Sequence, residues 1–292
     1  MTYPQIAAFA RLANGSVAPT RSIAGQSTQL VRDSHDIFYD EVNDEIVVAN
    51  AFAQAIMFYR GGANGEEPPV RVIQGPHTQI QMPGYGVYVD AVHNEVYLME
   101  GRDRPGLEYL LVFPRTAKGD VAPIRVIKGP DTMMKNARSM AVDPIRNLIA
   151  MTSNNGLLIF NRTDTGNVKP RAIIRGTGRS RGPGGNFRIT SGGWIVAGGG
   201  GGGDDDGGGG GGGRAGGRGE AGTRGGGEGS RGRVALRVWR VTDNGQVPPA
   251  FELTNPNGGN GGSRVALNPK TKEVYLGSSQ AVEVYSFPEI FE

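Results

Sequence analysis

Pro68-Pro69-Val70-Arg71-Val72-Ile73-Gln74-Gly75 decides the fold of this chain, because related blocks recur along the sequence. The blocks that begin at Ala18 and Ala122 repeat its proline, arginine, isoleucine and closing glycine at the same spacing. A weaker copy begins at Lys169, and a copy at Pro248 has lost both the arginine and the glycine. A repeat of this length indicates one supersecondary unit that is stacked on copies of itself.

Each block follows an apolar segment that ends in an aromatic residue. These residues are Phe9, Phe58, Phe113, Phe160, Trp239 and Tyr285, and they lie 49, 55, 47, 79 and 46 residues apart. Between the aromatic residue and the block lies a turn such as Asn14-Gly15 or Asn64-Gly65. Asn-Gly provides the positive φ angles that tight hairpins need. We therefore expect the aromatic strand, the turn and the proline-arginine strand to form one hairpin.

A second hairpin completes each unit. In one copy Val87-Tyr88-Val89 and Val96-Tyr97-Leu98 flank a turn that Asp90 opens, and an aspartate or asparagine opens the corresponding turn in three other copies. Four short antiparallel strands every 46 to 55 residues are typical of a β-propeller blade. We expect one all-β propeller domain over 1–292, built of four-stranded antiparallel blades, with five blades favoured and six as the alternative. A two-sheet sandwich is the competing architecture, but sandwiches do not repeat a four-strand unit at a fixed period.

The repeat resembles the NHL-type propeller family. The resemblance rests on the turn Val89-Asp90 to Asn94-Glu95, on the strand that follows it, and on the aromatic strand; the Pro-x-Arg-x-Ile-x-Gly hairpin is similar to a bacterial branch. It covers 5–176 well and 234–287 loosely. The resemblance implies the propeller fold but no single activity, because the family includes binding scaffolds together with a few hydrolases and lyases.

Composition sets broad limits. The chain of 292 residues has a net charge of +3, a surplus too small to indicate nucleic acid by itself, and no cysteine for disulfides or thiol chemistry. No apolar run approaches the roughly 18 residues that span a bilayer. The first residues lack the basic and apolar regions of a signal peptide. We expect an extracellular or cell-surface protein if the chain is processed, and a cytoplasmic one if Met1 is the native start.

One strand is surplus. We letter the strands of a blade a to d from the channel outward. Five a–b pairs need five c–d pairs, but the sequence has six c strands. Either 5–10 or 282–287 therefore has no place in a five-bladed ring. An unpaired edge strand is a template for another chain. The alternative is a five-stranded last blade or a loose tail. The candidate assembly residues on these strands are Ile6, Phe9, Val282, Val284, Tyr285 and Phe287.

A glycine-rich segment, 198–233, is inserted between the b and c strands of one blade. Its five arginines offset three aspartates and two glutamates, and it has no apolar residue larger than alanine with which to build a core. Three interpretations of the segment are a flexible loop, an Arg-Gly tract that binds nucleic acid, and glycine runs that pack against a partner subunit. The absence of aromatic residues weakens the nucleic-acid interpretation. Arg214, Arg218 and Arg224 are its candidate assembly residues.

A catalytic signature is absent from the sequence. The three histidines lack metal-ligand spacing, and neither a nucleophile elbow nor a phosphate loop is present. Related propeller hydrolases hold a divalent metal over the channel with Glu, Asn and Asp, so the resemblance implies a comparable rim set here. The corresponding positions are His35, Asn50, Tyr85, Glu100, Asn136, Asn154 and Asn186. Glu100 is the one carboxylate among them, whereas calcium prefers several.

The recurring arginines Arg21, Arg71 and Arg125 are expected to pair with a Glu or Asp of the adjacent strand. The sequence favours a non-catalytic propeller scaffold that binds another protein or assembles with itself into a ring or filament. That function predicts no cofactor. The alternatives are a metal-dependent lactonase or hydrolase with calcium, and, more weakly supported, nucleic-acid binding through the Arg-Gly loop.

Overall fold

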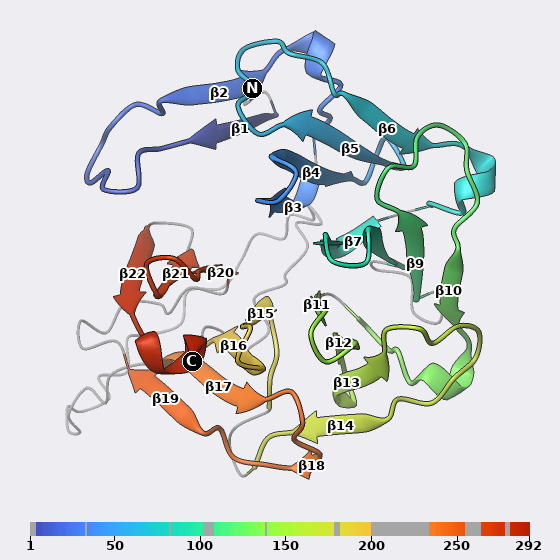
Figure 1. Ribbon diagram of the computed structural model, residues 1–292, viewed down its shortest axis with the longest axis vertical. Coiled ribbons are helices and arrows are strands. Elements are labelled where there is room, and N and C mark those ends of the chain that lie inside the picture. The colour runs from blue at the N-terminus through green and yellow to red at the C-terminus, as the bar shows by residue number, and fades with distance from the viewer. Residues whose placement is uncertain are drawn as a thin grey trace, which may run out of the picture.

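The computed structural model describes residues 4–32, 34–81, 83–101, 108–137, 139–177, 182–199, 234–254, 264–277 and 281–292. Side chains at positions 34, 35, 84 and 85 lie outside this description. The described strands form six sheets that surround a central channel like the blades of a propeller (Figure 1). The predicted all-β propeller is therefore confirmed.

Three sheets follow the chain without interruption. The first contains β3 (Ser34–Asp40), β4 (Glu45–Asn50), β5 (Ala55–Arg60) and β6 (Arg71–Gln74). The second contains β7 (Pro83–Asp90), β8 (Glu95–Glu100), β9 (Tyr109–Pro114) and β10 (Arg125–Lys128). The third contains β11 (Met140–Asp143), β12 (Leu148–Ser153), β13 (Gly156–Asn161) and β14 (Ala172–Arg175), and the short β18 (Gly245–Gln246) adds to it in parallel.

The remaining sheets differ in completeness. The fourth contains β15 (Phe187–Ile189), β16 (Trp194–Gly198), β17 (Val234–Arg240) and β19 (Phe251–Thr254). The fifth has three described strands, β20 (Arg264–Asn268), β21 (Glu273–Gly277) and β22 (Val282–Ser286). The sixth consists of β1 (Gln5–Ala8) and β2 (Arg21–Ala24). Four short 3-10 helices are η1 (Gln26–Thr28), η2 (Pro76–Thr78), η3 (Pro130–Thr132) and η4 (Pro288–Phe291).

Five of these sheets have an a strand, which agrees with the five blades that the repeat favoured. The a strands β3, β7, β11, β15 and β20 are successive neighbours around the channel (Figure 1). Within the described residues, β20 and β3 make no comparable contact, so the inner ring is open between the last blade and the first. The β1–β2 hairpin lies outside this opening.

The a–b turns have the local bonding that their sequences predict. Asp90 Oδ1 accepts the backbone N–H groups of Val92 at 2.9 Å and His93 at 3.0 Å. The same pattern recurs at Asp40, Asp143 and Asn268. Because this bonding satisfies backbone donors inside the turn, it fixes the register at which the two inner strands pair.

Apolar side chains alternate along the strands and pack between neighbouring sheets. One core, between the first two complete sheets, includes Phe58 and Val87, and the next includes Tyr97 and Met140; all four are at most 2% exposed. Each blade is therefore buried on both faces wherever it has a neighbour on each side.

Two of the three recurring arginines, Arg71 and Arg125, pair with glutamates, but not with those of the adjacent strand. Arg125 on β10 contacts Glu95 at the start of β8, with Nη2 and Oε2 2.7 Å apart, although β9 lies between these strands. Arg162 from the next sheet reaches the same oxygen at 2.8 Å. Arg71 pairs with Glu45 in the same way, and Arg115 joins them at 3.1 Å. The expectation of an adjacent partner is wrong because the long arginine side chain extends past the c strand.

We expect Glu95→Gln to lower the free energy of unfolding by about 3 kcal/mol, because it leaves two half-buried guanidinium groups without their carboxylate. Chemical denaturation with urea measures this change. Glu67→Gln is the matched control, because its partner Arg60 is exposed and solvent screening leaves such a pair little effect on stability. Equal losses for the two variants would contradict the structural role of Glu95.

The same carboxylate predicts a pH dependence. Burial opposes ionisation of Glu95, but hydrogen bonds from Arg125, Tyr97 and Arg162 hold its pKa below the ordinary value of 4.5. Its contribution to stability is therefore present above pH 4.5 and is lost as the pH falls through the lowered pKa. We expect the stability difference between the wild type and Glu95→Gln to shrink in acid; a constant difference between pH 7 and pH 3 would contradict this assignment.

Candidate functional site: the open seam

The site lies where the last sheet meets the β1–β2 hairpin. We call it the seam and define it by Ile6, Ile37, Tyr275, Val282 and Val284. On the fifth blade, β22 pairs with β21 and takes the edge that β1 would need in a closed five-bladed ring. Within the described residues β1 pairs with β2 alone, and the outer edge of β22 pairs with no strand. The surplus c strand that the sequence predicted is therefore present.

Apolar side chains on β3 are exposed at the seam. Ile37 is 45% exposed, whereas Val87 and Met140, at the same position of the next two blades, are 2% and 1% exposed. Tyr39 is exposed as well, while its counterparts in the next two blades, Val89 and Val142, are buried. The inner strand of the first blade thus presents to solvent a face that the other blades cover.

The facing side of the seam shows the same difference. Val282 on β22 is 66% exposed, and Val284 is also exposed. Strand pairing aligns Val282 with Ile56, Leu110 and Leu157, each 0% exposed. Two apolar faces therefore stand on either side of the seam without the neighbour that the repeat provides elsewhere.

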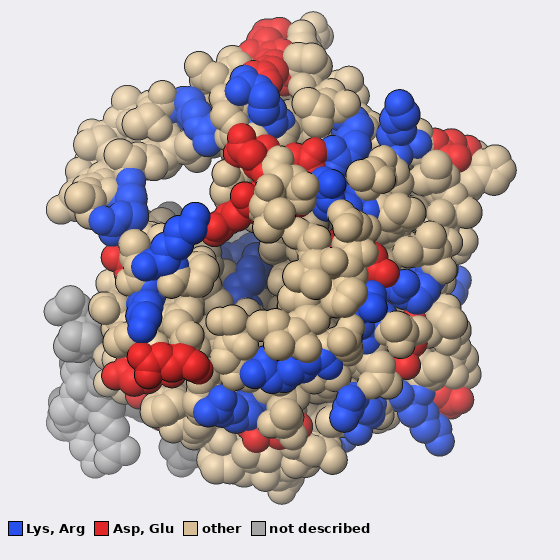
Figure 2. Space-filling model, in the orientation of Figure 1, with Lys and Arg blue, Asp and Glu red and all other residues tan. Residues whose placement is uncertain are grey.

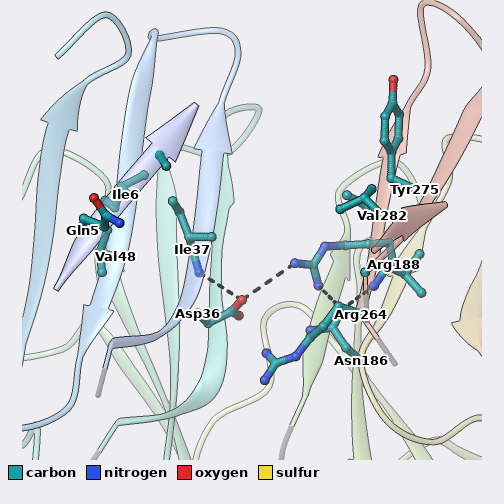
Figure 3. Close-up of a pocket in the computed structure, with 14 residues that line it drawn as sticks. Gln5, Ile6, Asp36, Ile37, Val48, Asn186, Arg188, Arg264, Tyr275 and Val282 are labelled. Atoms are coloured by element: carbon teal, nitrogen blue, oxygen red, sulfur yellow. Dashed lines mark hydrogen bonds and ion pairs between the residues drawn. The ribbon is translucent and has the colours of Figure 1, made fainter. Parts of the chain in front are cut away.

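A cavity of about 570 Å³ fills the space between these faces. Its walls come from β1, β3, β15 and the three strands of the last sheet, with Ile6, Ile37 and Val282 among the lining residues (Figure 3). In the space-filling view an opening separates the β1–β2 hairpin at the upper left from the last sheet below it (Figure 2). The seam is therefore open to a chain segment rather than closed by side chains.

Charged groups line the channel end of the cavity. Asp36 accepts the backbone N–H groups of Ile37 and Val87, both at 3.0 Å, and its Oδ1 lies 3.9 Å from Arg188 Nη2 (Figure 3). Burial raises the pKa of Asp36, although Arg188 opposes the rise. Asn186 Oδ1 accepts from Arg188 at 3.2 Å and holds that guanidinium in place.

The predicted assembly residues divide into two groups. Ile6 and Val282 line the cavity, and Val284 and Phe9 are exposed. Tyr285 and Phe287 instead pack against the core between the last two sheets, and the Phe287 ring lies 5.7 Å from that of Phe251. Arg214, Arg218 and Arg224 lie outside the described residues, as does most of the glycine-rich segment 198–233.

Two of the predicted rim residues contact each other. Asn136 Nδ2 donates to Asn154 Oδ1 at 3.2 Å, while Asn50 and Glu100 are buried at the ends of β4 and β8. Asn186 alone of the described side chains in this set lines the cavity, and the side chains of His35 and Tyr85 are outside the description. Among the described residues, no group of three His, Cys, Asp or Glu side chains could hold a metal ion.

The sequence did not single out Asp36, Arg188 or Arg264, which form the charged end of the cavity. A signal was present at one of them. Arg188 stands where the preceding blades have Phe38, Tyr88 and Ala141, because Ile189 pairs with Ile195 as Tyr39 pairs with Ile46. A charge in an otherwise apolar repeat position indicates an environment that differs from the other blades.

Comparison with known proteins supports the fold and no particular activity. No family model and no curated protein matches the sequence. One solved structure that shares the fold is a functionally unknown protein from Desulfotomaculum acetoxidans DSM 771. It has 14% sequence identity and a TM-score of 0.55, over 92% of this chain and 72% of that one. Within the described part of the chain, no helix has the length and apolar character that a transmembrane helix needs.

We expect the stability of the Asp36→Asn variant, relative to that of the wild type, to increase as the pH rises. A carboxyl group whose pKa is raised on folding destabilises the folded protein above the ordinary value of 3.8, because ionisation is harder in the folded state. Thermal unfolding of both proteins from pH 4 to pH 8 measures the trend. A stability difference that does not change with pH would contradict it.

Proposed function

We propose that this protein is a non-catalytic β-propeller scaffold that binds another protein chain at the seam by β-strand addition. The main support for this proposal is the exposure of Ile37 and Val282 at positions that are buried in the other blades. Among the described strands, none pairs with the outer edge of β1 or of β22, so these edges can receive an added strand. Apolar side chains of the bound chain would cover the exposed faces.

The bound chain can be another protein or a further copy of this one. Head-to-tail addition between copies gives a ring if the rotation closes and a filament if it does not. The glycine-rich segment remains a proposed second assembly element, because glycine allows close approach of backbones. We retain the NHL-type propeller family as the proposed relationship of the repeat, on the strength of the residues that suggested it.

Neither alternative function gains support from the described residues. Among the described residues, no group of three His, Cys, Asp or Glu side chains could hold a metal ion, so a metal-dependent lactonase or hydrolase gains no support from them. The Arg-Gly tract, on which nucleic-acid binding depends, lies almost wholly outside the described residues. The scaffold is therefore the function that we carry forward.

We expect Val284→Glu to weaken association of the purified protein, because it places a charge on the exposed apolar face beside the open edge. Light scattering over a concentration series measures the mass. Val92→Glu is the control, since Val92 is equally apolar and exposed but lies in the turn between β7 and β8.

An unchanged concentration dependence in Val284→Glu, with or without a partner protein present, would remove the support for binding at the seam. A loss shared with Val92→Glu would instead report general solubility and would equally count against the seam.

A further inference from the structure

Within a blade, the residue types at two positions depend on each other, and this dependence indicates what fills the seam. The first position is the start of strand b and the second is the start of strand d. Glu45 pairs with Arg71 in the first blade, and Glu95 pairs with Arg125 in the second. In both, the guanidinium passes the c strand, and Arg71 lies over the Phe58 ring with its central carbon 3.8 Å from the centroid.

The two positions change together in the other blades. Strand pairing places Leu148 and Ala172 there in the third blade, where neither residue is charged. It places Trp194 and Phe251 there in the fourth, and their rings meet at 5.3 Å. A glutamate on strand b is therefore found with an arginine on strand d, and an apolar residue with an apolar one.

The sheets on either side of the seam each hold one half of such a pair. Glu273 starts the b strand of the last blade, which has no described d strand. Arg11 from the β1–β2 hairpin contacts Glu273 at 3.0 Å. This contact corresponds to those of Arg115 and Arg162 with the preceding blade, so the hairpin stands one blade step beyond the last blade. The same-blade arginine is the missing member.

Arg21 is the complementary half. It starts strand d of the hairpin, at the position of Arg71 and Arg125, but its sheet has no described b strand. Its guanidinium donates to the carbonyl oxygens of Gly61 and Ala63 in the next sheet, and it makes no ion pair with a described carboxylate. The hairpin is thus the outer half of a further blade whose inner strands would supply a glutamate.

The strands that are missing at the seam form one consecutive stretch of the repeat. Among the described residues, the last blade has no d strand and the hairpin beyond it has no a or b strand, so the missing order is d, a, b. In the repeat, one continuous segment runs through these three strands, as β6, β7 and β8 do. The cavity of about 570 Å³ and the exposed Ile37 lie where the a and b strands would stand.

We propose that the seam binds a three-strand segment of this same repeat type that another polypeptide provides. Its first strand carries an arginine that pairs with Glu273, and its third strand begins with a glutamate that pairs with Arg21. Its apolar side chains cover Ile37 on one side and Val282 on the other. This inference rests on the proposed function and specifies the partner of the same site.

A second copy of the folded chain is a poorer donor. Its described d–a–b segments are already paired within its own sheets, so donation would require one of its blades to unfold. A partner whose repeat segment is free meets the requirement without that cost.

The test uses the full chain and a labelled peptide of residues 68–100, which contains one d–a–b segment with Arg71 and Glu95. Fluorescence anisotropy measures its binding. We expect saturable binding that weakens about tenfold or more in Arg21→Glu, because a charge-assisted contact becomes a repulsion. A peptide with Glu95→Arg should reverse the preference, with tighter binding to Arg21→Glu than to the wild type.

Arg171→Glu is the matched control, since Arg171 is an exposed arginine next to strand d of the third blade, away from the seam. It should bind the unmodified peptide as the wild type does. Recovery with the charge-reversed peptide also shows that Arg21→Glu is folded.

Absence of binding, or binding that ignores the charge reversal, would overturn the assignment of the partner. If Val284→Glu nevertheless changes association, the strand-addition scaffold stands and this partner alone is rejected. Self-association that an excess of the peptide does not dissolve would also overturn the choice of occupant.

Discussion

Backbone hydrogen bonds at a turn glycine join each of the first four blades to the sheet before it, and the rest of the architecture depends on them. Gly119 donates to Val72 O at 2.7 Å, and its own carbonyl accepts from Gln74 at 3.1 Å. Gly65 and Gly166 form the same parallel bridge to the preceding sheet. At Gly119 the φ of 72° favours glycine because of the backbone conformation itself, since a Cβ there would meet no other atom within 4 Å. The turn chemistry of a hairpin therefore also sets the spacing between blades.

Much of this fold could be predicted from the sequence because its signals are periodic. The proline-arginine blocks and the Asn-Gly turns repeat in step, so strand order and blade count follow from position alone. The surplus c strand followed from counting. The charged end of the cavity could not be predicted, because Asp36 and Arg188 interact across the channel between strands that are far apart in sequence. Arg188 differs in residue type from its counterparts in the repeat, but nothing in the sequence shows that it meets Asp36.

The partners of the recurring arginines show a second limit. The sequence indicated local pairing but placed the carboxylate on the adjacent strand, whereas Arg71 reaches Glu45 beyond the c strand. Only the strand register shows that the b and d positions change together. The exchange of Glu and Arg for Trp194 and Phe251 in the fourth blade preserves contact while removing charge. Such a pair therefore helps to specify which strands match within a blade. At the seam, Glu273 and Arg21 each have no same-blade partner among the described residues.

The joint at the seam differs in kind from the others. Gly15 has the φ of 71° shared by the bridging glycines, yet no described d strand of the last blade meets it. Arg11–Glu273 and Lys270–Glu41, two ion pairs with exposed lysine and arginine, connect the two sides instead. Counterions screen exposed charges, whereas they leave buried backbone bonds unaffected. We therefore expect concentrated salt to weaken the contact across the seam more than the backbone bridges between the other sheets, so that the width of the opening depends on ionic strength.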